Sequence, residues 1–366
     1  MKILQISSAR YFGSSEKHLI SLCKGLQARG HEVFVMLRPS CEWKERLDFL
    51  PKENLFHVSI RNSIGIFSAQ KIAKFVRERN IEIIHAHITR DYFPASLACR
   101  ITKTPKFILT RHSATPMKSF HRFSLTNLSK LIGVSEGIKK NLQILFPKEK
   151  IIAITNGIEV IGLSAEEKKK MRENFRLENN IPLDSFLVGT IGEIKETNGQ
   201  RDFVLAAQLI AEKFPESHFA IIGKDNAVNQ PFRRELRRMV KIFGLTERFL
   251  WLDWVSETAN FYNALDVLVS PSHSESFSLA TLEAMTNETA IVATETELSK
   301  ELLRNNETGL IVPVKEPVQL ADAVNRLLAD EVLRAELGNK ALISAHENFD
   351  VQKMIDETEK VYQSLF

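Results

Sequence analysis

The stretch Ser270–Met285 has the sequence SPSHSESFSLATLEAM. The residues that lead into it, ALDVLVS at 264–270, have the apolar composition of a short buried strand, and Leu279–Met285 carry apolar residues at helical spacing. Serine and proline crowd the turn between them, where Ser276 and Ser278 are both N-cap candidates. A turn that opens a helix presents free backbone N–H groups and the positive end of the helix dipole. The stretch therefore predicts a binding site for a phosphate group.

Two glutamates flank this predicted phosphate site. Glu275 lies in the turn, and Glu283 lies eight residues later, inside the helix. A carboxylate cannot hold a phosphate, but it accepts hydrogen bonds from hydroxyl groups beside one, and sugar hydroxyls are the obvious candidates. The alternative is that Glu275 caps a turn and that Glu283 is a solvated helix residue.

The same stretch resembles the E-x7-E motif of the family 4 glycosyltransferases, which are retaining enzymes of the GT-B architecture. The resemblance implies a catalytic place for Glu275 beside the donor sugar and a contact from Glu283 to the nucleotide ribose. It also implies that the backbone around the helix start binds the donor diphosphate. The donor-binding residues would then be Ser276, Phe277, Ser278 and Leu279. Two glycines of the family pattern are replaced here, by Ser276 and Ser278.

Strand-like runs alternate with helical patterns along all 366 residues, a length sufficient for two domains. The alternation predicts an α/β fold with parallel sheets and helices on both faces. The resemblance continues in order over nearly the whole chain and implies two Rossmann-like domains that face each other across a cleft. We expect an acceptor-binding domain at 1–160, a linker at 161–185 and a nucleotide-sugar-binding domain at 186–349. The helix at 350–366 is expected to cross back to the first domain.

A glycine turn follows the first expected strand, Lys2–Ser7. Ligands of such folds bind beyond the carboxyl ends of the strands, so this turn is well placed for binding. Its sequence, YFGSSEKH at 11–18, resembles the Gly-Gly-Ala-Glu loop of the family, although only Gly13 and Glu16 of that pattern are present. The resemblance implies a donor contact for Gly13 and a place in the cleft for Ser14. A simple tight turn is the alternative.

Three histidines follow two further strands of the first half. His85 and His87 lie at the end of the strand expected at 82–86, and His112 follows the strand expected at 106–110. Residues two apart on a strand point the same way, but no third ligand follows at a spacing typical of a metal site. We therefore expect no metal here. The family resemblance implies a catalytic place for His112 near the donor sugar and a place near the acceptor for His87; a core histidine, a rim histidine and a surface-loop histidine are the alternatives.

The most important departure from the family lies at 192–199, GEIKETNG. The family pattern carries an arginine and a lysine that hold the donor diphosphate, and this chain has Glu193 and Asn198 at those positions. Each charge contact to a phosphate contributes about 1–4 kcal/mol at a separation of about 4 Å. Lys195, Arg201 and Lys224 are the candidate replacements, and Lys195 is taken as the donor-binding residue.

Charge is divided unevenly along the chain. Residues 1–160 carry 26 Lys and Arg against 12 Asp and Glu, whereas the remainder carries 23 against 33. No acidic residue occurs from Tyr92 to Ser135, where basic residues alternate with phenylalanines. This pattern favours contact with an anionic membrane surface, and a solvated basic face is the alternative. No nucleic-acid recognition motif accompanies it, so we expect no nucleic-acid partner.

The remaining composition indicates a soluble protein with a cytoplasmic location. No run approaches the length of a transmembrane helix, the first residues are too soon interrupted for a signal peptide, and the three cysteines are not spaced for a metal. The resemblance implies a retaining, metal-independent glycosyltransferase that uses a UDP-, GDP- or ADP-sugar and no cofactor. Its acceptor would be a glycan or a lipid-linked precursor of the lipopolysaccharide or cell envelope. The alternatives are a non-catalytic GT-B binding or scaffolding protein and a sugar-nucleotide epimerase.

Overall fold

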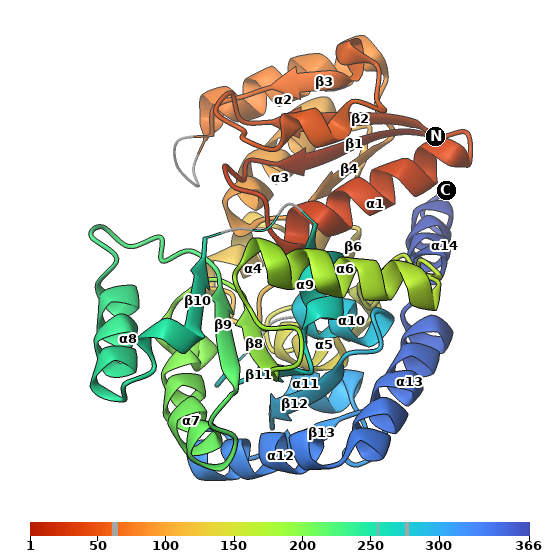
Figure 1. The fold of residues 1–366 in the computed structure, drawn as a ribbon. Helices are drawn as coiled ribbons and strands as arrows, with labels where there is room; N and C mark the ends of the chain where they lie inside the picture. The colour runs from red at the N-terminus through yellow and green to blue at the C-terminus, as the bar shows by residue number, and fades with distance from the viewer. Residues whose placement is uncertain (61–64, 254, 256, 275–277) are drawn as a thin grey trace. The chain divides into compact units, whose positions relative to one another are not determined.

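The structure is a computed structural model that describes residues 1–60, 65–253, 255, 257–274 and 278–366. The chain forms two compact units (Figure 1). Unit 1 comprises Met1–Gly157 together with Phe349–Phe366, and unit 2 comprises Ile158–Asn348. Each is an α/β unit built around one parallel sheet, as the alternation of strands and helices predicts.

Unit 1 contains a seven-stranded sheet in the order β3-β2-β1-β4-β5-β6-β7, in which every neighbouring pair is parallel. Its strands are β1 (Lys2–Ser7), β2 (Glu32–Leu37), β3 (Leu55–His57), β4 (Ile83–Ala86), β5 (Lys106–Arg111), β6 (Lys130–Gly133) and β7 (Ile151–Ala153). The strand order reverses between β1 and β4. The loops that follow these two strands therefore flank the switch point where ligands of open α/β sheets bind.

The helices of unit 1 lie between successive strands, except for the C-terminal helix. They are α1 (Ser14–Ala28), α2 (Ile66–Arg79), α3 (Thr89–Thr102), α4 (Phe120–Ser124), α5 (Glu136–Leu142) and the C-terminal α14 (Val351–Gln363). Helix α14 packs on α1, where a Cβ atom at Gly25 would lie 2.2 Å from the Ile355 side chain. Arg29 also pairs with Glu359 at 2.7 Å. The last helix thus belongs to unit 1, in agreement with the expectation that it returns to the first domain.

Unit 2 contains a six-stranded parallel sheet in the order β10-β9-β8-β11-β12-β13. Its strands are β8 (Leu187–Ile191), β9 (His218–Ile222), β10 (Phe249–Leu252), β11 (Val267–Ser270), β12 (Ala290–Thr294) and β13 (Leu310–Val312). Its helices are α6 (Ala165–Glu178), α7 (Gln200–Lys213), α8 (Pro231–Ile242), α9 (Thr258–Ala264), α10 (Leu279–Thr286), α11 (Glu297–Leu302), α12 (Pro317–Ala329) and α13 (Glu331–Asn348). Here the strand order reverses between β8 and β11, so the loops after these strands are the expected ligand loops.

The polar stretch at 161–185, interpreted above as a linker, is largely helical in the structure. It contains α6, which begins with a capping box between Ser164 and Glu167. Arg176 of α6 is buried and donates hydrogen bonds to the Ala264 carbonyl and to Asp266, which fixes the helix within unit 2. The charged composition of the segment gives no indication that α6 packs within unit 2, because the buried charge is a single arginine that is paired inside the unit.

Smaller differences concern strands. The short edge strand β3 is not among the strands expected from the sequence. Strand β4 begins one residue later than the strand expected at 82–86, and β5 ends one residue later than the strand expected at 106–110. Among the helices of the described residues, none combines the length and apolar character needed to span a lipid bilayer.

Candidate functional site

In unit 2, the turn from β11 into α10 forms the start of a capped helix. Ser278 is the N-cap, and its hydroxyl accepts a hydrogen bond from the Thr281 backbone N–H at 3.2 Å. Leu279 is the first helical residue and is buried. Glu275, Ser276 and Phe277 lie outside the described residues. The N-cap prediction for Ser278 is therefore confirmed.

The β11–α10 turn is tied to the neighbouring loops by hydrogen bonds. The Thr294 hydroxyl donates to the Ser270 and Ser272 carbonyls, at 3.2 and 2.5 Å. His273 donates its backbone N–H to the Thr197 carbonyl at 2.9 Å, and its ring Nε2 lies 2.7 Å from Asp202 of α7. The turn after β11 and the turn after β8 therefore form one connected structure at the switch point of the sheet.

Close backbone approach explains two glycines in this region. Gly199 has φ +70°, and a Cβ atom there would lie 1.9 Å from the Pro271 carbonyl oxygen. Gly223 has φ +155°, and its Cβ would lie 1.8 Å from the Gly192 carbonyl oxygen. Neither contact leaves room for a side chain, and a positive φ also disfavours other residues. The loops after β8, β9 and β11 therefore meet backbone to backbone.

The residues at the expected clamp positions form a hydrogen-bonded group of their own. The Glu193 carboxylate pairs with Lys195 at 3.1 Å and accepts a hydrogen bond from the Asn226 amide at 2.9 Å. Asn198 donates its side-chain amide to the Glu193 carbonyl at 2.8 Å. Burial alone would raise the pKa of Glu193, but the partners Asn226 and Lys195 outweigh it and lower this pKa. Lys195 is therefore partly neutralised by a glutamate beside it.

The other two candidate replacements for the clamp differ in whether their side chains are already paired. Arg201 pairs with Glu235 at 2.7 Å and its guanidinium lies over the Phe232 ring, so it is already engaged. Lys224 is exposed, and its side chain has no hydrogen-bond or ion-pair partner within the described residues. Its backbone carbonyl accepts a hydrogen bond from Ile194, which places it beside the β8 loop. Lys224 is thus the available cation of this set.

Glu283 lies on α10 and is partly exposed. Its backbone carbonyl accepts hydrogen bonds from the hydroxyl of Thr286 and the side-chain amide of Asn287. The Tyr262 hydroxyl is nearby: burial first, and the charge of Glu283 second, raise the pKa of Tyr262 well above its ordinary value. A carboxylate held in this position can accept hydrogen bonds from ligand hydroxyls.

In unit 1, the turn after β1 leads into α1. Gly13 is the N-cap with φ −153°, an extended conformation, and both it and Ser14 are exposed. Glu16, in the first turn of the helix, is buried and accepts hydrogen bonds from the Ser7 and Ser15 hydroxyls at 3.3 and 2.8 Å. Burial raises the pKa of Glu16 despite these donors.

Behind this turn lies a hydrogen-bonded chain that begins on the C-terminal helix. The Tyr362 hydroxyl accepts from the Gln5 amide at 3.1 Å and lies 2.6 Å from His85 Nδ1, while His85 Nε2 lies 2.7 Å from the Thr110 hydroxyl. The Gln5 amide oxygen lies 2.7 Å from His87 Nε2, and an amide oxygen can only accept. His87 therefore carries its proton on Nε2 and presents the lone pair of Nδ1.

His112 and His18 complete a cluster around that lone pair. His112 Nε2 lies 3.5 Å from His87 Nδ1, and one nitrogen each of His18, His87 and His112 lie within 4.8 Å of one another. Neither nitrogen of His18 makes a regular hydrogen bond among the described residues, and the same is true of His112 Nδ1. We call His18, His87 and His112 the histidine cluster.

Burial keeps the histidine cluster neutral. Burial lowers the pKa of His18 to about 4, against an opposing contribution from the neighbouring Asn156. Burial, followed by the charges of neighbouring histidines, also lowers the pKa values of His87 and His112 well below their ordinary range. Of the two residues predicted here, His112 is partly exposed and His87 is buried behind it, so His87 is not a rim residue.

Three residues of this region are not predicted as site residues from the sequence. His18, Gln5 and Tyr362 come from α1, β1 and α14, and Gln5 and Tyr362 are 357 residues apart. Gln5 does carry one signal, because it is a polar residue within an otherwise apolar strand. His18 and Tyr362 have no comparable signal, because both occur in ordinary amphipathic helical patterns.

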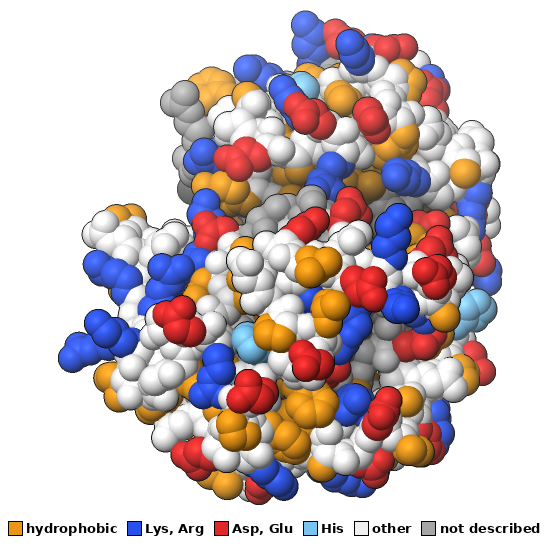
Figure 2. All heavy atoms as spheres, in the orientation of Figure 1, with side chains coloured by type: hydrophobic (Ala, Val, Ile, Leu, Met, Phe, Trp, Pro, Cys, Tyr) orange, Lys and Arg blue, Asp and Glu red, His pale blue; other side chains and the backbone are white. Residues whose placement is uncertain are grey.

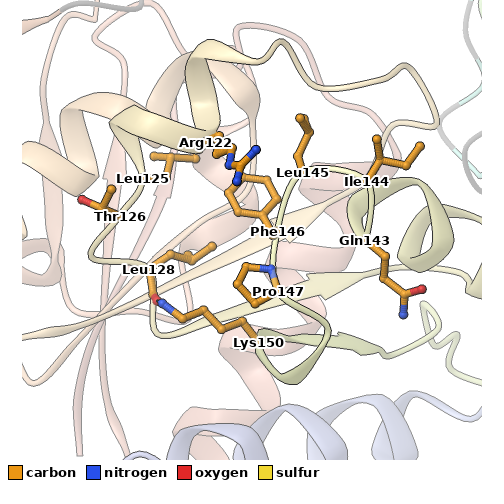
Figure 3. A pocket seen from close by; sticks show the side chains of 10 residues that line it. All are labelled: Arg122, Leu125, Thr126, Leu128, Gln143, Ile144, Leu145, Phe146, Pro147 and Lys150. Atoms are coloured by element: carbon orange, nitrogen blue, oxygen red, sulfur yellow. The ribbon is translucent and has the colours of Figure 1, made fainter.

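Two further regions carry cationic side chains. In unit 2, Lys and Arg side chains gather over α8 (Figure 2), where Arg234, Arg237 and Arg238 are exposed. In unit 1, a hollow of about 480 Å³ lies between α4 and the segment that follows α5. Its lining side chains are drawn in Figure 3: Arg122, Leu125, Thr126, Leu128, Gln143, Ile144, Leu145, Phe146, Pro147 and Lys150. This apolar hollow is thus bordered by two cations.

Comparison with known families identifies both halves of the chain. Residues 15–160 match the family described as Glycosyltransferase Family 4, and residues 171–342 match the family described as Glycosyl transferases group 1. The two matches together span most of both units.

Individual relatives agree with the family matches. The chain is 27% identical to the lipopolysaccharide core biosynthesis mannosyltransferase LpcC of Rhizobium leguminosarum bv. viciae, over 79% of this chain and 76% of that protein. It is 23% identical to the capsular polysaccharide biosynthesis glycosyltransferase CapM of Staphylococcus aureus, over 84% of each. The crystal structure of Anabaena HepE in complex with UDP-glucose has a TM-score of 0.86 at 20% identity and covers 100% of both chains.

Proposed function

This chain belongs to the family 4 glycosyltransferases of the GT-B fold, and we propose that it transfers a sugar from a nucleoside diphosphate donor to a cell-envelope glycan or its lipid-linked precursor. Relatives named for lipopolysaccharide core and capsular polysaccharide synthesis support this acceptor class. The observation that carries the proposal is the connected group of loops after β8, β9 and β11, which presents a capped helix start at the switch point of unit 2.

The proposed donor site uses backbone groups more than side-chain charge. The start of α10, from Ser278 and Leu279 onward, offers N–H groups to the diphosphate. Lys224 and Lys195 supply the positive charge that the usual clamp would provide. Glu283 accepts hydrogen bonds from the ribose, and Glu275 takes the family place beside the sugar.

The proposed reaction retains the anomeric configuration and uses no metal ion. The leaving diphosphate is stabilised by backbone N–H groups, the helix dipole and lysines, which is electrostatic stabilisation without a Lewis acid. The acceptor attacks from the face that the diphosphate leaves, and the departing phosphate helps to remove the acceptor proton. No carboxylate is assigned as a covalent nucleophile.

In unit 1, we assign His112 to the donor sugar. If His112 donates Nε2–H to His87, its unpartnered Nδ1 is a hydrogen-bond acceptor. This Nδ1 atom is buried, so a sugar hydroxyl reaches it only if the partly exposed His112 ring turns, and a neutral His112 would then accept a hydrogen bond from that hydroxyl. Gly13 and Ser14, exposed at the start of α1, border the same site, and His87 acts by orienting His112.

The acceptor class motivates a membrane contact through unit 1. Phe120 and Phe123 of α4 are 53% and 73% exposed, and Ile144 at the hollow is 77% exposed. The exposed Arg122 borders the same hollow, as does Lys150, whose Nζ donates to the Leu128 carbonyl at 2.8 Å. Apolar side chains surrounded by cations favour an anionic bilayer surface, so we propose a peripheral association with the cytoplasmic face of the membrane.

Calorimetric titration with UDP, GDP and ADP, in the presence of a chelator, tests the donor site. We expect one nucleotide to bind with a micromolar dissociation constant and Lys224→Ala to weaken it by about tenfold, which corresponds to about 1.4 kcal/mol. Lys241→Ala, on the exposed face of α8, is the control. A folded protein that binds none of the three nucleotides would overturn the proposal and favour a non-catalytic role.

Sedimentation with lipid vesicles tests the membrane contact separately. The protein should bind vesicles that contain phosphatidylglycerol and leave neutral phosphatidylcholine vesicles unbound. Phe123→Ser and Arg122→Ser should each reduce binding, whereas Val332→Ser, an exposed apolar residue of unit 2, should not. Equal binding to both vesicle types, or to neither, would contradict the contact.

A further inference from the structure

The histidine cluster has the chemistry of a transition-metal site. Three imidazoles that are held neutral by burial offer lone pairs to one point, and neutral imidazole suits Zn²⁺, Cu²⁺ and Ni²⁺ better than it suits Mg²⁺ or Ca²⁺. No metal site is predicted from the sequence because no third ligand follows His85 and His87 at a suitable spacing. The fold supplies the missing ligands from α1 and from the loop after β5.

The hydrogen-bond network prepares His87 as a ligand. Gln5 holds the proton of His87 on Nε2 and leaves Nδ1 bare, and Gln5 is itself held by Tyr362. Metal-binding histidines commonly donate their second ring N–H to such a partner, which fixes the orientation of the ring. His87 already has this arrangement within the protein.

The distances fit a metal with a small adjustment. Two nitrogens bound tetrahedrally to Zn²⁺ at about 2.0–2.1 Å lie about 3.3 Å apart, close to the 3.5 Å between His112 Nε2 and His87 Nδ1. The same 3.5 Å is long for an N–H···N hydrogen bond. The largest separation in the cluster, 4.8 Å, exceeds the about 4.2 Å that two such bonds can span, so an imidazole ring must rotate slightly on binding.

Unsatisfied nitrogens give the second, independent observation. Neither nitrogen of His18, which is 4% exposed, makes a hydrogen bond of regular geometry among the described residues, although the Asn156 side chain lies beside it. An unsatisfied buried polar atom costs about 1–3 kcal/mol. A bound cation would satisfy one nitrogen of His18.

We propose that His18, His87 and His112 bind one transition-metal dication, with Zn²⁺ as the test ion, and that this ion inhibits sugar transfer. Inhibition follows because the ion occupies the nitrogen of His112 and changes the orientation of its ring. The inhibition rests on the proposed function, whereas metal binding does not.

The test is calorimetric titration of the untagged full chain with ZnCl₂ and, separately, MgCl₂. We expect Zn²⁺ to bind with a stoichiometry of one, and His18→Gln and His112→Gln each to weaken it at least tenfold. His121→Gln is the matched control, because His121 also has unpartnered ring nitrogens but is not part of the cluster. Absence of Zn²⁺ binding, or equal binding by all three variants, would overturn the proposal.

A measurement on the unsubstituted protein guards against variants that fail to fold. Co²⁺ bound by three imidazoles in a tetrahedral or five-coordinate site gives intense visible absorption, which Zn²⁺ should abolish by displacement. A weak spectrum typical of octahedral Co²⁺ would contradict the site. Zn²⁺ binding without nucleotide binding would leave the metal site standing and overturn the transferase function, and the reverse result would do the opposite.

Discussion

The two units build their candidate sites from different materials. In unit 1, side chains make the site: the histidine cluster is oriented by Gln5 and, through it, by Tyr362. In unit 2, the backbone makes the site, because glycines let three loops approach each other closely around a capped helix start. A side-chain site depends on hydrogen bonds and protonation, whereas a backbone site depends on shape. Substitutions should therefore damage the two sites in different ways.

The largest effect should come from Gly199→Ala in unit 2. The added Cβ would meet the Pro271 carbonyl at 1.9 Å in addition to the strain of φ +70°. Left-handed strain alone costs about 1–2 kcal/mol, so the total loss in free energy of unfolding should exceed it. Thermal and urea unfolding measure the loss. Gly244→Ala is the control, because Gly244 has the same φ and no described atom within 4 Å of its Cβ position; equal losses for both variants would refute the shape argument.

In unit 1, Tyr362→Phe removes the partner of both Gln5 and His85. An unsatisfied buried group costs about 1–3 kcal/mol, and we expect a loss in that range by urea unfolding. Nitrogen-15 NMR of the imidazoles should also show a lower preference of His87 for the Nε2–H tautomer. Tyr11→Phe, at a tyrosine that is 50% exposed, should change neither. An unchanged His87 tautomer would show that Gln5 needs no support from α14.

The pH dependence of stability should be sensitive to Asp91 in unit 1. Burial raises the pKa of Asp91 to about 7, although its carboxylate accepts a hydrogen bond from the Ser8 N–H. Between about pH 4 and 7 Asp91 therefore binds more protons in the folded state than in the unfolded state, and its contribution to the free energy of unfolding falls as pH rises, by up to about 1.4 kcal/mol per pH unit. The buried histidines of lowered pKa contribute with the opposite sign over the lower part of this range. Asp91→Asn should remove this contribution, so that the free energy of unfolding becomes more favourable to the folded state with rising pH than in the unsubstituted protein, whereas Asp322→Asn, at an exposed carboxylate, should leave the slope unchanged. An unchanged slope in Asp91→Asn would place the pKa of this carboxyl near its ordinary value.

The smallest effect should come from Glu193→Gln in unit 2. The substitution removes the negative charge that pairs with Lys195 and frees that lysine for a diphosphate. At an exposed site a charge contact is worth about 1 kcal/mol, so nucleoside diphosphate affinity should rise by about fivefold in calorimetry. Glu235→Gln, which removes the partner of Arg201, is the control. Weaker binding by Glu193→Gln would show that this glutamate itself supports the donor site.

Much of the fold is predictable because its signals are local. The strand at 2–7 is predicted with the bounds that the structure has, since it is a short apolar run followed by turn residues. The edge strand β3 is missed because three residues give no usable periodicity. The helix at 165–178 is missed because its buried arginine makes the segment resemble a polar linker.

The candidate site is predictable where one short segment carries it. The N-cap at Ser278 can be recognised because capping involves residues only three apart. The pairing of Glu193 with Lys195 and Asn226 cannot be recognised in the same way, because Asn226 comes from the loop after β9. The sequence therefore predicts a weakened clamp without revealing that its glutamate engages one of the replacement lysines.

The sequence by itself determined the α/β class and the start of α10, because periodicity and capping act over a few neighbouring residues, and its motifs carried the resemblance to the family. Only the tertiary structure decided that His18 joins His87 and His112, and that a tyrosine of the last helix orients a glutamine of the first strand. These groupings depend on the order in which parallel strands pair and on where α14 packs. Such long-range packing brings together residues whose contact cannot be recognised from the sequence around either one.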